Sequence, residues 1–437
     1  GSGGGDDGSF FVFPGLFLVG EGARVEGEFG LPAAAMASGV GGMGVHWGGS
    51  CPRHTGAERV PFIESTELDA LYDRAEQLLG VSKDLHENDE LLVSLRDVIA
   101  AEFEPEAPGG APVGFMPVAA QRDGTRTRTT GTGRILGDLP TRKGFELRPE
   151  TLARRILLDG DTAVGALLED RVTHDLYEVR AQRVVVCADS LRTPQLLWAS
   201  GIRPRALGHH LNDHFQMSGI VLFDDEYVRD VAPLDPDSGE VMVPVADRVR
   251  PPAMGSVLVP YADDVRPMQG QLVPLSRIGG LLPTGEAFGE INANQLGILA
   301  WYGAKDIQFS DAVLFDDERT DHYGMPAMTI RYTLTENDQR TIELLRTNLA
   351  RMAKLVGNLL GEPAFAPGGS SLHYQGTVRM GTADDGTSVC DPYCRVWGVR
   401  HLNVGGNGVI PTSTSANPTL TTVALSVRAA TELARGL

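Results

Sequence analysis

A glycine-rich turn close to the C-terminus has the residue types of a ligand-binding loop. Gly405, Gly406 and Gly408 surround Asn407, directly after the segment HLNV, which is predicted to be a strand. Glycines let backbone N–H groups come close to an anionic or carbonyl-bearing ligand, and the helix predicted to begin at Pro418 adds partial positive charge at its N-terminus. We therefore expect a binding turn here, although a single glycine turn does not identify the ligand.

The cysteines do not have the spacing of a metal site. Cys390 and Cys394 lack the second pair that a zinc site needs, and four cysteines are too few to staple a chain of 437 residues. We expect no metal, and a reducing compartment, the cytoplasm.

The composition excludes several classes of partner. The chain has 57 acidic and 38 basic side chains, and its net charge of -19 repels phosphate backbones and anionic lipid. No stretch reaches the roughly 18 to 20 apolar residues that span a bilayer, and the opening GSGGGDDGSF lacks the regions of a signal peptide. We expect neither nucleic acid nor a membrane as partner, and no export signal.

The middle of the chain has the pattern of a doubly wound sheet. LARRILLD, TAVGALLEDRV and LYEVRAQRVVVCA predict a three-stranded meander whose last strand becomes a fully buried apolar run. Helical PQLLWAS follows that run at once. Ligands bind beyond the carboxyl ends of the strands in such sheets, and the chain is predicted to be α/β, or α+β overall.

A second domain with an antiparallel sheet is predicted from the short β-like runs of residues 215–361, such as MSGIVLF and QLGILAWY. A long helix follows Thr335, with Asp338 completing a capping box, and should cover this sheet. Trp301 and Tyr302 could offer aromatic faces to a ligand, but their alternation with neighbouring residues favours the core.

Three further segments complete the prediction of local structure. FFVFPGLFLVG is expected to form a strand or a buried turn, and a helix should begin at Thr66, with Asp69 in a capping box, and end at Gly80. Residues 108–137 lack periodicity and indicate a long connection.

Three motifs together carry a family resemblance. GGMGVHW near the start, LHYQGTVRMG, and NVGGNGVIPTSTSANPTLTTVALSVRAA at the end resemble the glucose-methanol-choline (GMC) family of flavin oxidoreductases, and most closely its pyranose 2-oxidase branch, which includes the bacterial glycoside 3-oxidases. The resemblance implies a Rossmann-like FAD-binding domain of the p-hydroxybenzoate hydroxylase type and an antiparallel-sheet substrate domain. The expected division is a discontinuous FAD domain of residues 9–60, 138–214 and 381–437, a connecting segment with a helix at 61–137, and a substrate domain at 215–380.

The resemblance also implies a reaction. The ring carbon that bears a secondary hydroxyl of a pyranose or glycoside, carbon 3 or carbon 2, would lose its hydrogen as hydride to flavin N5 and become the keto carbon. The electrons would pass to O2, giving H2O2, or to a quinone. His373 matches the histidine that takes the hydroxyl proton, and Asn417 matches the residue that holds the developing alkoxide. Without the resemblance, Asn417 followed by Pro418 favours an ordinary helix start, with asparagine at the cap and proline at the first helical position.

FAD is the cofactor that the resemblance implies, and His46 matches the position at which related enzymes attach it covalently. The flanking residues differ here, so covalent attachment and noncovalent packing both stay open. Val378 departs from the family at a position where a second histidine is common. The residues expected to bind FAD are Gly41, Gly42, Met43, His46, Trp47, Gly406, Asn407, Pro418 and Thr419.

The sequence departs most from the family at its N-terminus. The strand, GxGxxG turn and helix that bind the ADP half of FAD are not found, because Gly39, Gly41 and Gly44 follow LPAAAMAS rather than a strand. We expect the first βαβ unit to come from a second polypeptide or a lost N-terminal piece. Two alternatives therefore accompany an oxidase, namely a flavin-fold scaffold without activity and a sugar dehydrogenase with a partner-protein acceptor.

Overall fold

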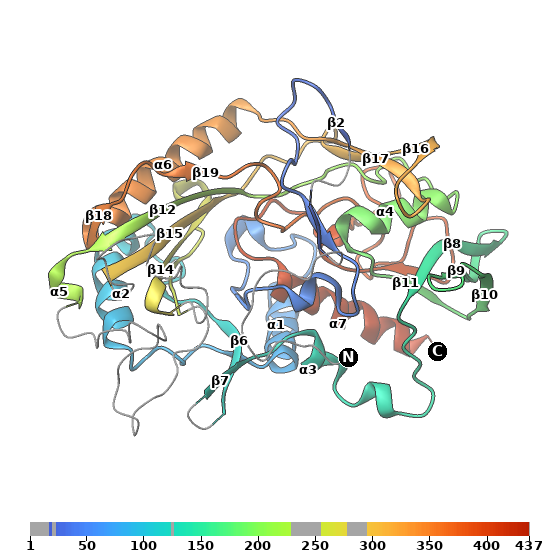
Figure 1. The fold of residues 1–437 in the computed structure, drawn as a ribbon, viewed down its shortest axis with the longest axis horizontal. Helices are drawn as coiled ribbons and strands as arrows, with labels where there is room; N and C mark the ends of the chain where they lie inside the picture. The colour runs from blue at the N-terminus through green and yellow to red at the C-terminus, as the bar shows by residue number, and fades with distance from the viewer. Residues whose placement is uncertain (1–16, 20–22, 124–125, 229–254, 278–294, 437) are drawn as a thin grey trace.

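The computed structural model describes residues 17–19, 23–123, 126–228, 255–277 and 295–436. Most of FFVFPGLFLVG lies outside these ranges, and its described part forms strand β1 (Phe17–Val19). Figure 1 shows a large sheet with helices α6 (Glu336–Val356) and α2 (Glu90–Phe103) at one end of the molecule and the meander of strands β8 to β10 (residues 151–180) at the other. No helix in the described ranges is long and apolar enough to cross a membrane.

The large sheet is antiparallel, as the sequence predicts. Its hydrogen-bonded order is β18-β12-β15-β14-β13-β5, and β19 also pairs with β12. Most of its strands fall within the predicted substrate domain, although β5 comes from the predicted connecting segment. The strands are β5 (Gly114–Phe115), β12 (Phe215–Phe223), β13 (Val257–Val259), β14 (Met268–Pro274), β15 (Leu296–Gly303), β18 (Gly357–Leu359) and β19 (Ala364–Phe365).

Two helices cover one face of this sheet. Helix α6 (Glu336–Val356) begins with the predicted capping box of Thr335 and Asp338, and α2 (Glu90–Phe103) packs into the same hydrophobic cluster. Side chains alternate between the two faces of a strand, so Met268 and Leu272 of β14 enter this cluster while Gln269 and Gln271 face the other way. That other face carries glutamines, and the candidate site lies against it.

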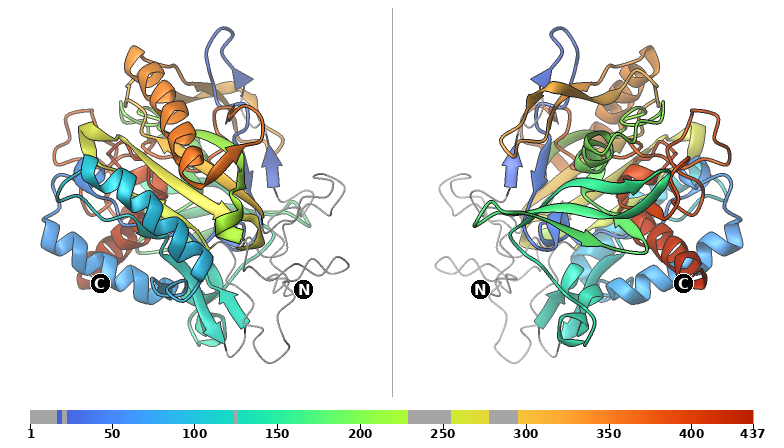
Figure 2. Two further views of the ribbon diagram at one scale, coloured as in Figure 1. Left: turned by 90° about the vertical axis from the view of Figure 1, so that its left-hand side faces the viewer. Right: turned by 90° about the vertical axis from the view of Figure 1, so that its right-hand side faces the viewer.

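A second part of the molecule is built on two parallel strands. β11 (Val184–Val186) pairs in parallel with β20 (Leu402–Val404), and α4 (Asp189–Ala199) follows β11 as predicted. The carboxyl ends of both strands therefore meet at one edge. Helices α1 (Ser65–Leu79) and α7 (Thr419–Arg435) lie against each other, drawn blue and red in Figure 2.

The predicted meander is correct for three strands but wrong for its buried end. β8 (Thr151–Asp159), β9 (Thr162–Asp170) and β10 (Leu176–Arg180) form an antiparallel sheet. The chain then leaves this sheet, and VVV forms β11 in another, where Val185 is 53% exposed. An apolar run indicates a strand, but its burial depends on neighbours that the local pattern does not contain.

Three other local predictions need correction. Helix α1 ends at Gly80, whose φ of +67° suits glycine, but no side chain caps its start, and Asp69 bonds to Arg59 instead. LPAAAMAS contains a short strand, β3 (Ala35–Ala37), which pairs antiparallel with β1 and leads into a 3-10 turn rather than a dinucleotide-binding helix. Residues 108–137 are predicted to be a long connection, but they contain regular structure. Besides β5, they form strands β6 (Val118–Asp123) and β7 (Arg126–Thr129) and the short helix α3 (Thr132–Leu136).

The remaining elements connect these parts. β2 (Ala23–Arg24), β16 (Ala312–Thr320) and β17 (Pro326–Arg331) make a small sheet, and α4 packs against β16 and β17. β4 (Val81–Ser82) pairs with β6, and α5 (Asp225–Val228) follows β12.

Candidate active site

His373 and His214 lie side by side where two loops meet. An antiparallel bridge joins Asn212 to Gln375, with backbone N–H to carbonyl distances of 2.9 and 2.8 Å. The two segments run in opposite directions. His214 lies two residues after Asn212 and His373 lies two residues before Gln375, so the two histidines lie opposite each other. His373 Nδ1 and His214 Nε2 are 2.8 Å apart, and the two rings meet edge to face with centroids 4.7 Å apart.

Both of these imidazoles are neutral at pH 7. Burial lowers the pKa of His373 to about 4 and lowers the pKa of His214 well below its usual value. A neutral imidazole can accept a proton, so His373 has the protonation state of a general base. The contact with His214 occupies Nδ1 of His373, which leaves Nε2 as the nitrogen for a substrate.

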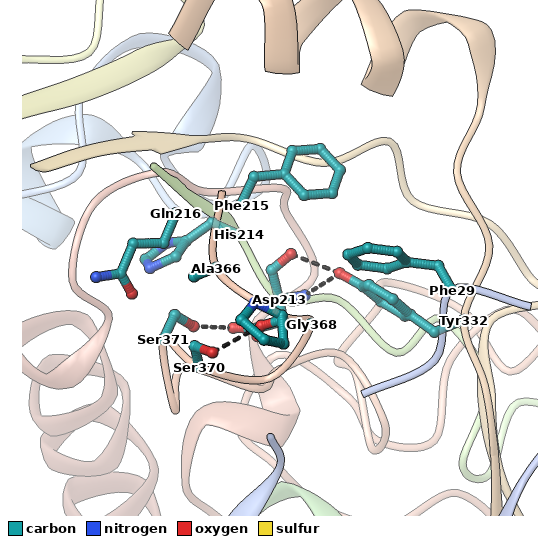
Figure 3. Close-up of a pocket in the computed structure, with 11 residues that line it drawn as sticks. Phe29, Asp213, His214, Phe215, Gln216, Tyr332, Ala366, Gly368, Ser370 and Ser371 are labelled. Carbon is teal, nitrogen blue, oxygen red and sulfur yellow. Dashed lines mark hydrogen bonds between the residues drawn. The ribbon is translucent and has the colours of Figure 1, made fainter. Parts of the chain in front are cut away.

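Asp213 anchors the backbone on both sides of the histidine pair. Its carboxylate accepts a hydrogen bond from Ser371 Oγ, which itself accepts one from the His373 backbone N–H at 3.1 Å. The Tyr332 hydroxyl accepts from the Asp213 N–H at 2.9 Å and donates to the Asp213 carbonyl at 2.5 Å (Figure 3). Burial raises the pKa of the Asp213 carboxyl to about 7. These bonds fix the two segments that carry the imidazoles.

Asn417 faces the large sheet and does not cap the helix that follows it. Its Oδ1 accepts hydrogen bonds from Gln269 Nε2 at 3.2 Å and Gln271 Nε2 at 3.3 Å. Helix α7 has Pro418 at its N-cap position and no side-chain cap bond, so the cap interpretation is wrong. Because both glutamines donate to the oxygen, the Nδ2 group of Asn417 is the donor that remains for a ligand.

Glu58 holds the loop that leads into Asn417. Glu58 Oε1 accepts from the Ser415 N–H at 2.6 Å, from Ser415 Oγ at 2.9 Å and from the Ala416 N–H at 3.0 Å. Its side chain is buried, and burial raises its pKa to about 7. Gln375 Nε2 donates to Thr414 Oγ1 at 2.7 Å, which ties this loop to the segment that follows His373.

A polar row crosses the open face of the sheet beside these groups. Gln216 on β12, Tyr302 on β15 and Gln269 on β14 are paired neighbours, and the ring centroid of Tyr302 is 5.1 Å from that of His214. Trp301 points the other way and is fully buried in the core. The core prediction is therefore confirmed for Trp301, whereas Tyr302 faces the candidate site.

Comparison with known proteins identifies the family. Two models of the GMC oxidoreductase family match residues 54–216 and 313–426. A C-glycoside 3-oxidase of Microbacterium trichothecenolyticum is 42% identical over 436 residues, which cover 96% of this chain and 80% of that relative. The chain belongs to the GMC oxidoreductase family. The resemblance carried by the sequence motifs is thereby confirmed.

Other GMC oxidoreductases extend the comparison. A pyranose 2-oxidase of Tricholoma matsutake is 29% identical and covers 95% of this chain and 76% of that relative. A solved formate oxidase of Aspergillus oryzae superposes with a TM-score of 0.70 at 14% identity, covering 97% of this chain and 89% of that chain. This likeness confirms the predicted fold class. Nothing in the comparisons supports a second polypeptide, and the scaffold alternative is not favoured.

FAD is the cofactor that membership of the GMC oxidoreductases implies, and the turn after β20 fits it. A Cβ on Gly405 would lie 2.8 Å from Cys187 Sγ, and one on Gly408 would lie 2.8 Å from Val378 Cγ2. Gly406 has a φ of +94°, and a Cβ there would meet no atom within 4 Å. The turn is therefore packed against protein on one side and open on the other, at the carboxyl ends of β11 and β20.

The other residues expected at the cofactor occupy two places. Asn407 Oδ1 accepts a hydrogen bond from Thr422 Oγ1, which fastens the turn to α7, and Pro418 and Thr419 form the start of that helix. The loop of Gly41, Gly42, Met43, His46 and Trp47 is a separate segment that contains a 3-10 turn (Gly42–Val45). Thr132 Oγ1 of α3 donates to the Gly41 carbonyl at 3.5 Å, and Trp47 packs against the core.

Sequence reasoning missed His214, Glu58 and the two glutamines of β14. His214 stands in LNDHF, directly before β12, and only its pairing with the segment around Gln375 gives it a place beside His373. The glutamines did leave a signal, because in MQGQLVP they alternate with apolar residues on a strand that is buried throughout.

Proposed function

We propose that this chain is an FAD-dependent oxidase of a secondary ring hydroxyl in a glycoside, acting at carbon 3 and passing electrons to O2. The observation that carries this proposal is the 42% identity with a C-glycoside 3-oxidase over nearly the whole chain. The less similar pyranose 2-oxidases make carbon 2 the alternative position. The geometry of His373 and Asn417 supplies groups suited to either position.

His373 is the proposed general base. Its neutral ring presents Nε2, which would take the proton of the sugar hydroxyl as the C–H bond at the same carbon breaks. FAD, when bound, supplies the acceptor for the hydride that leaves that carbon. A depressed pKa makes His373 a base that stays unprotonated in mildly acidic solution.

Asn417 is the proposed donor to the developing alkoxide. Gln269 and Gln271 fix its amide orientation before substrate arrives, so its Nδ2 needs no reorganisation during the reaction. An amide also stabilises the oxyanion without changing its own charge. The row of Gln216, Tyr302 and Gln269 offers further hydroxyl-binding groups to a sugar ring.

The FAD-binding part is proposed to consist of residues 9–60, 138–214 and 381–437, with 215–380 forming the substrate side and 61–137 connecting them. Within it, the turn of Gly406 and Asn407 and the backbone of Thr419 at the start of α7 would present N–H groups to FAD, while Pro418, which has no N–H, would set the direction of the helix start. Gly41, Gly42, Met43, His46 and Trp47 would form the loop against the flavin ring, with His46 as the residue for a covalent bond.

Anaerobic spectroscopy of the purified full chain supplied with FAD tests the proposal. A C-glycoside or O-glycoside should bleach the flavin absorption, and air should restore it with one H2O2 per sugar oxidised. If a quinone but not air reoxidises the flavin, the protein is a dehydrogenase rather than an oxidase. Flavin that stays oxidised with every pyranose tried would contradict the proposal. Acid precipitation of the same sample reads the bond to His46, because covalent flavin stays in the pellet.

A further inference from the structure

We propose that His214 is a positioning residue that holds His373 in the tautomer with the proton on Nδ1, so that Nε2 keeps its lone pair. This inference rests on the proposed function, because it concerns the nitrogen that would receive the sugar proton. His214 does not need to touch the sugar for this role, since it acts through His373.

The contact between the two rings requires one proton. His373 Nδ1 and His214 Nε2 are 2.8 Å apart, which is a hydrogen-bond distance. Each neutral imidazole carries its proton on one of its two nitrogens, so one ring donates across this contact and the other accepts. If His214 donates, His373 holds its remaining proton on Nε2 and cannot accept another there. If His373 donates, its Nε2 is free.

The surroundings of His214 decide between these two arrangements. The carbonyl of Thr414 acts to raise the pKa of His214, as an acceptor close to a ring N–H does, and Nε2 already faces His373. Nδ1 is buried and, among the described residues, has no partner within strict hydrogen-bond geometry. Because Nε2 is occupied by His373, Nδ1 is the ring nitrogen left to donate towards this backbone, and the base role proposed for His373 requires the same arrangement. His214 therefore carries its proton on Nδ1 and accepts from His373.

The fold makes this arrangement rigid. His214 is 4% exposed and packs against the ring of Tyr302. It follows Asn212 by two residues, and His373 precedes Gln375 by two residues, so the Asn212–Gln375 bridge holds both segments. Water cannot easily replace it as the acceptor for His373 Nδ1. A substitution at His214 should therefore change the tautomer of His373 rather than its position.

Two substitutions at this site separate the hydrogen bond from packing. Gln places an amide oxygen near the position of the imidazole Nε2, so His214→Gln keeps an acceptor for His373 Nδ1. His214→Leu fills similar space with no acceptor. We expect the rate of flavin reduction by a glycoside to fall about 10- to 100-fold in His214→Leu, with KM little changed, and to stay close to wild type in His214→Gln. Equal rates in all three proteins, or equal losses in both variants, would overturn the proposal.

Nitrogen-15 NMR of the imidazoles tests the tautomer without any turnover. In the wild-type protein, His373 should show a protonated Nδ1 and an unprotonated Nε2, and a His373→Asn sample assigns the signal. A protonated Nε2 in wild type would overturn the proposal. If wild type shows the expected tautomer but no sugar reduces the flavin, the proposed function fails while this inference stands. If His214→Leu does not fold, His214→Asn, whose amide is too short to reach His373, replaces it in the comparison.

Discussion

The side-chain oxygen of Asn417 accepts a hydrogen bond from the Gln269 amide, 3.2 Å away, across the boundary between the C-terminal segment and strand β14. This bond joins residues that lie 148 positions apart in the chain, since β14 belongs to the antiparallel sheet and Asn417 precedes the last helix. It turns Asn417 away from the helix start. The role of Asn417 can therefore be tested separately from the stability of α7.

Asn417→Ala should lower the rate of flavin reduction by about 100-fold, because the alkoxide loses one preorganised donor. Asn417→Asp is the matched control, since aspartate is as good a helix cap as asparagine but brings negative charge to a developing anion. Stopped-flow reduction by a glycoside measures both. Activity restored by aspartate would show that Asn417 acts as a cap and would contradict the proposed role.

His373→Ala should lower the rate of flavin reduction by about 1,000-fold while leaving the flavin content unchanged, because proton transfer fails and the cofactor contacts remain. Anaerobic stopped-flow experiments and the visible spectrum of the same sample give the two quantities. Near-normal reduction by sugar in this variant would remove His373 from its role.

The pH dependence of kcat/KM should follow the depressed pKa of His373. The activity should stay level as the pH falls from 8 to about 5 and then decline towards a pKa of about 4. The ordinary histidine pKa is about 6.5, so the unfolded chain takes up this proton first, and His373 costs stability as the pH falls from 6.5 towards 4. Fluorescence at each pH checks that the protein is folded. A decline centred near pH 6.5 in folded protein would contradict this prediction.

Glu58 should make stability depend on pH in the opposite direction. Its folded pKa of about 7 lies above the usual 4.5, so the folded state holds the proton more tightly, and stability falls as the pH rises from 4.5 to 7. Glu58→Gln cannot titrate at this position, so the fall in unfolding free energy that Glu58 causes between pH 4.5 and 7 should be absent from this variant. Glu58→Ala should lose about 3 kcal/mol of unfolding free energy, because the Ser415 and Ala416 N–H groups lose their buried acceptor. Urea unfolding at pH 5 and pH 8 measures both effects. An identical pH dependence in wild type and Glu58→Gln would refute this account of Glu58.

The buried pair of Lys305 and Asp311 gives a prediction about stability alone. Both side chains are fully buried, and Lys305 Nζ lies 2.5 Å from Asp311 Oδ2. Lys305→Met leaves a buried carboxylate without its counter-charge and should cost about 3 to 5 kcal/mol in unfolding free energy. The double variant Lys305→Met, Asp311→Asn should recover part of that loss. A single variant within 1 kcal/mol of wild type would be inconsistent with this pairing.

Local signals in the sequence predicted much of the fold. Helix α6 could be predicted from its capping box of Thr335 and Asp338 and from its apolar stripe, because both signals lie within the helix itself. The antiparallel sheet followed from its short alternating strands. The second predicted capping box, at Thr66 and Asp69, failed because Asp69 instead bonds to Arg59 outside the helix.

The candidate site was predictable only where a family motif carried it. His373 and Asn417 came from such motifs, but His214 comes from a bridge between segments more than 150 positions apart in the chain, which no local pattern contains. Asn417 likewise faces the candidate site instead of capping α7 because two glutamines of β14, distant in the chain, donate hydrogen bonds to its side chain.

The most direct test of the account is the deuterium isotope effect on flavin reduction by a glycoside labelled at a single ring carbon. If the hydroxyl at carbon 3 is oxidised, deuterium at carbon 3 should slow reduction several-fold, and deuterium at carbon 2 should leave it unchanged. An effect from carbon 2 alone would assign the other position. Reduction that neither label slows would contradict hydride removal at either carbon and with it the central claim.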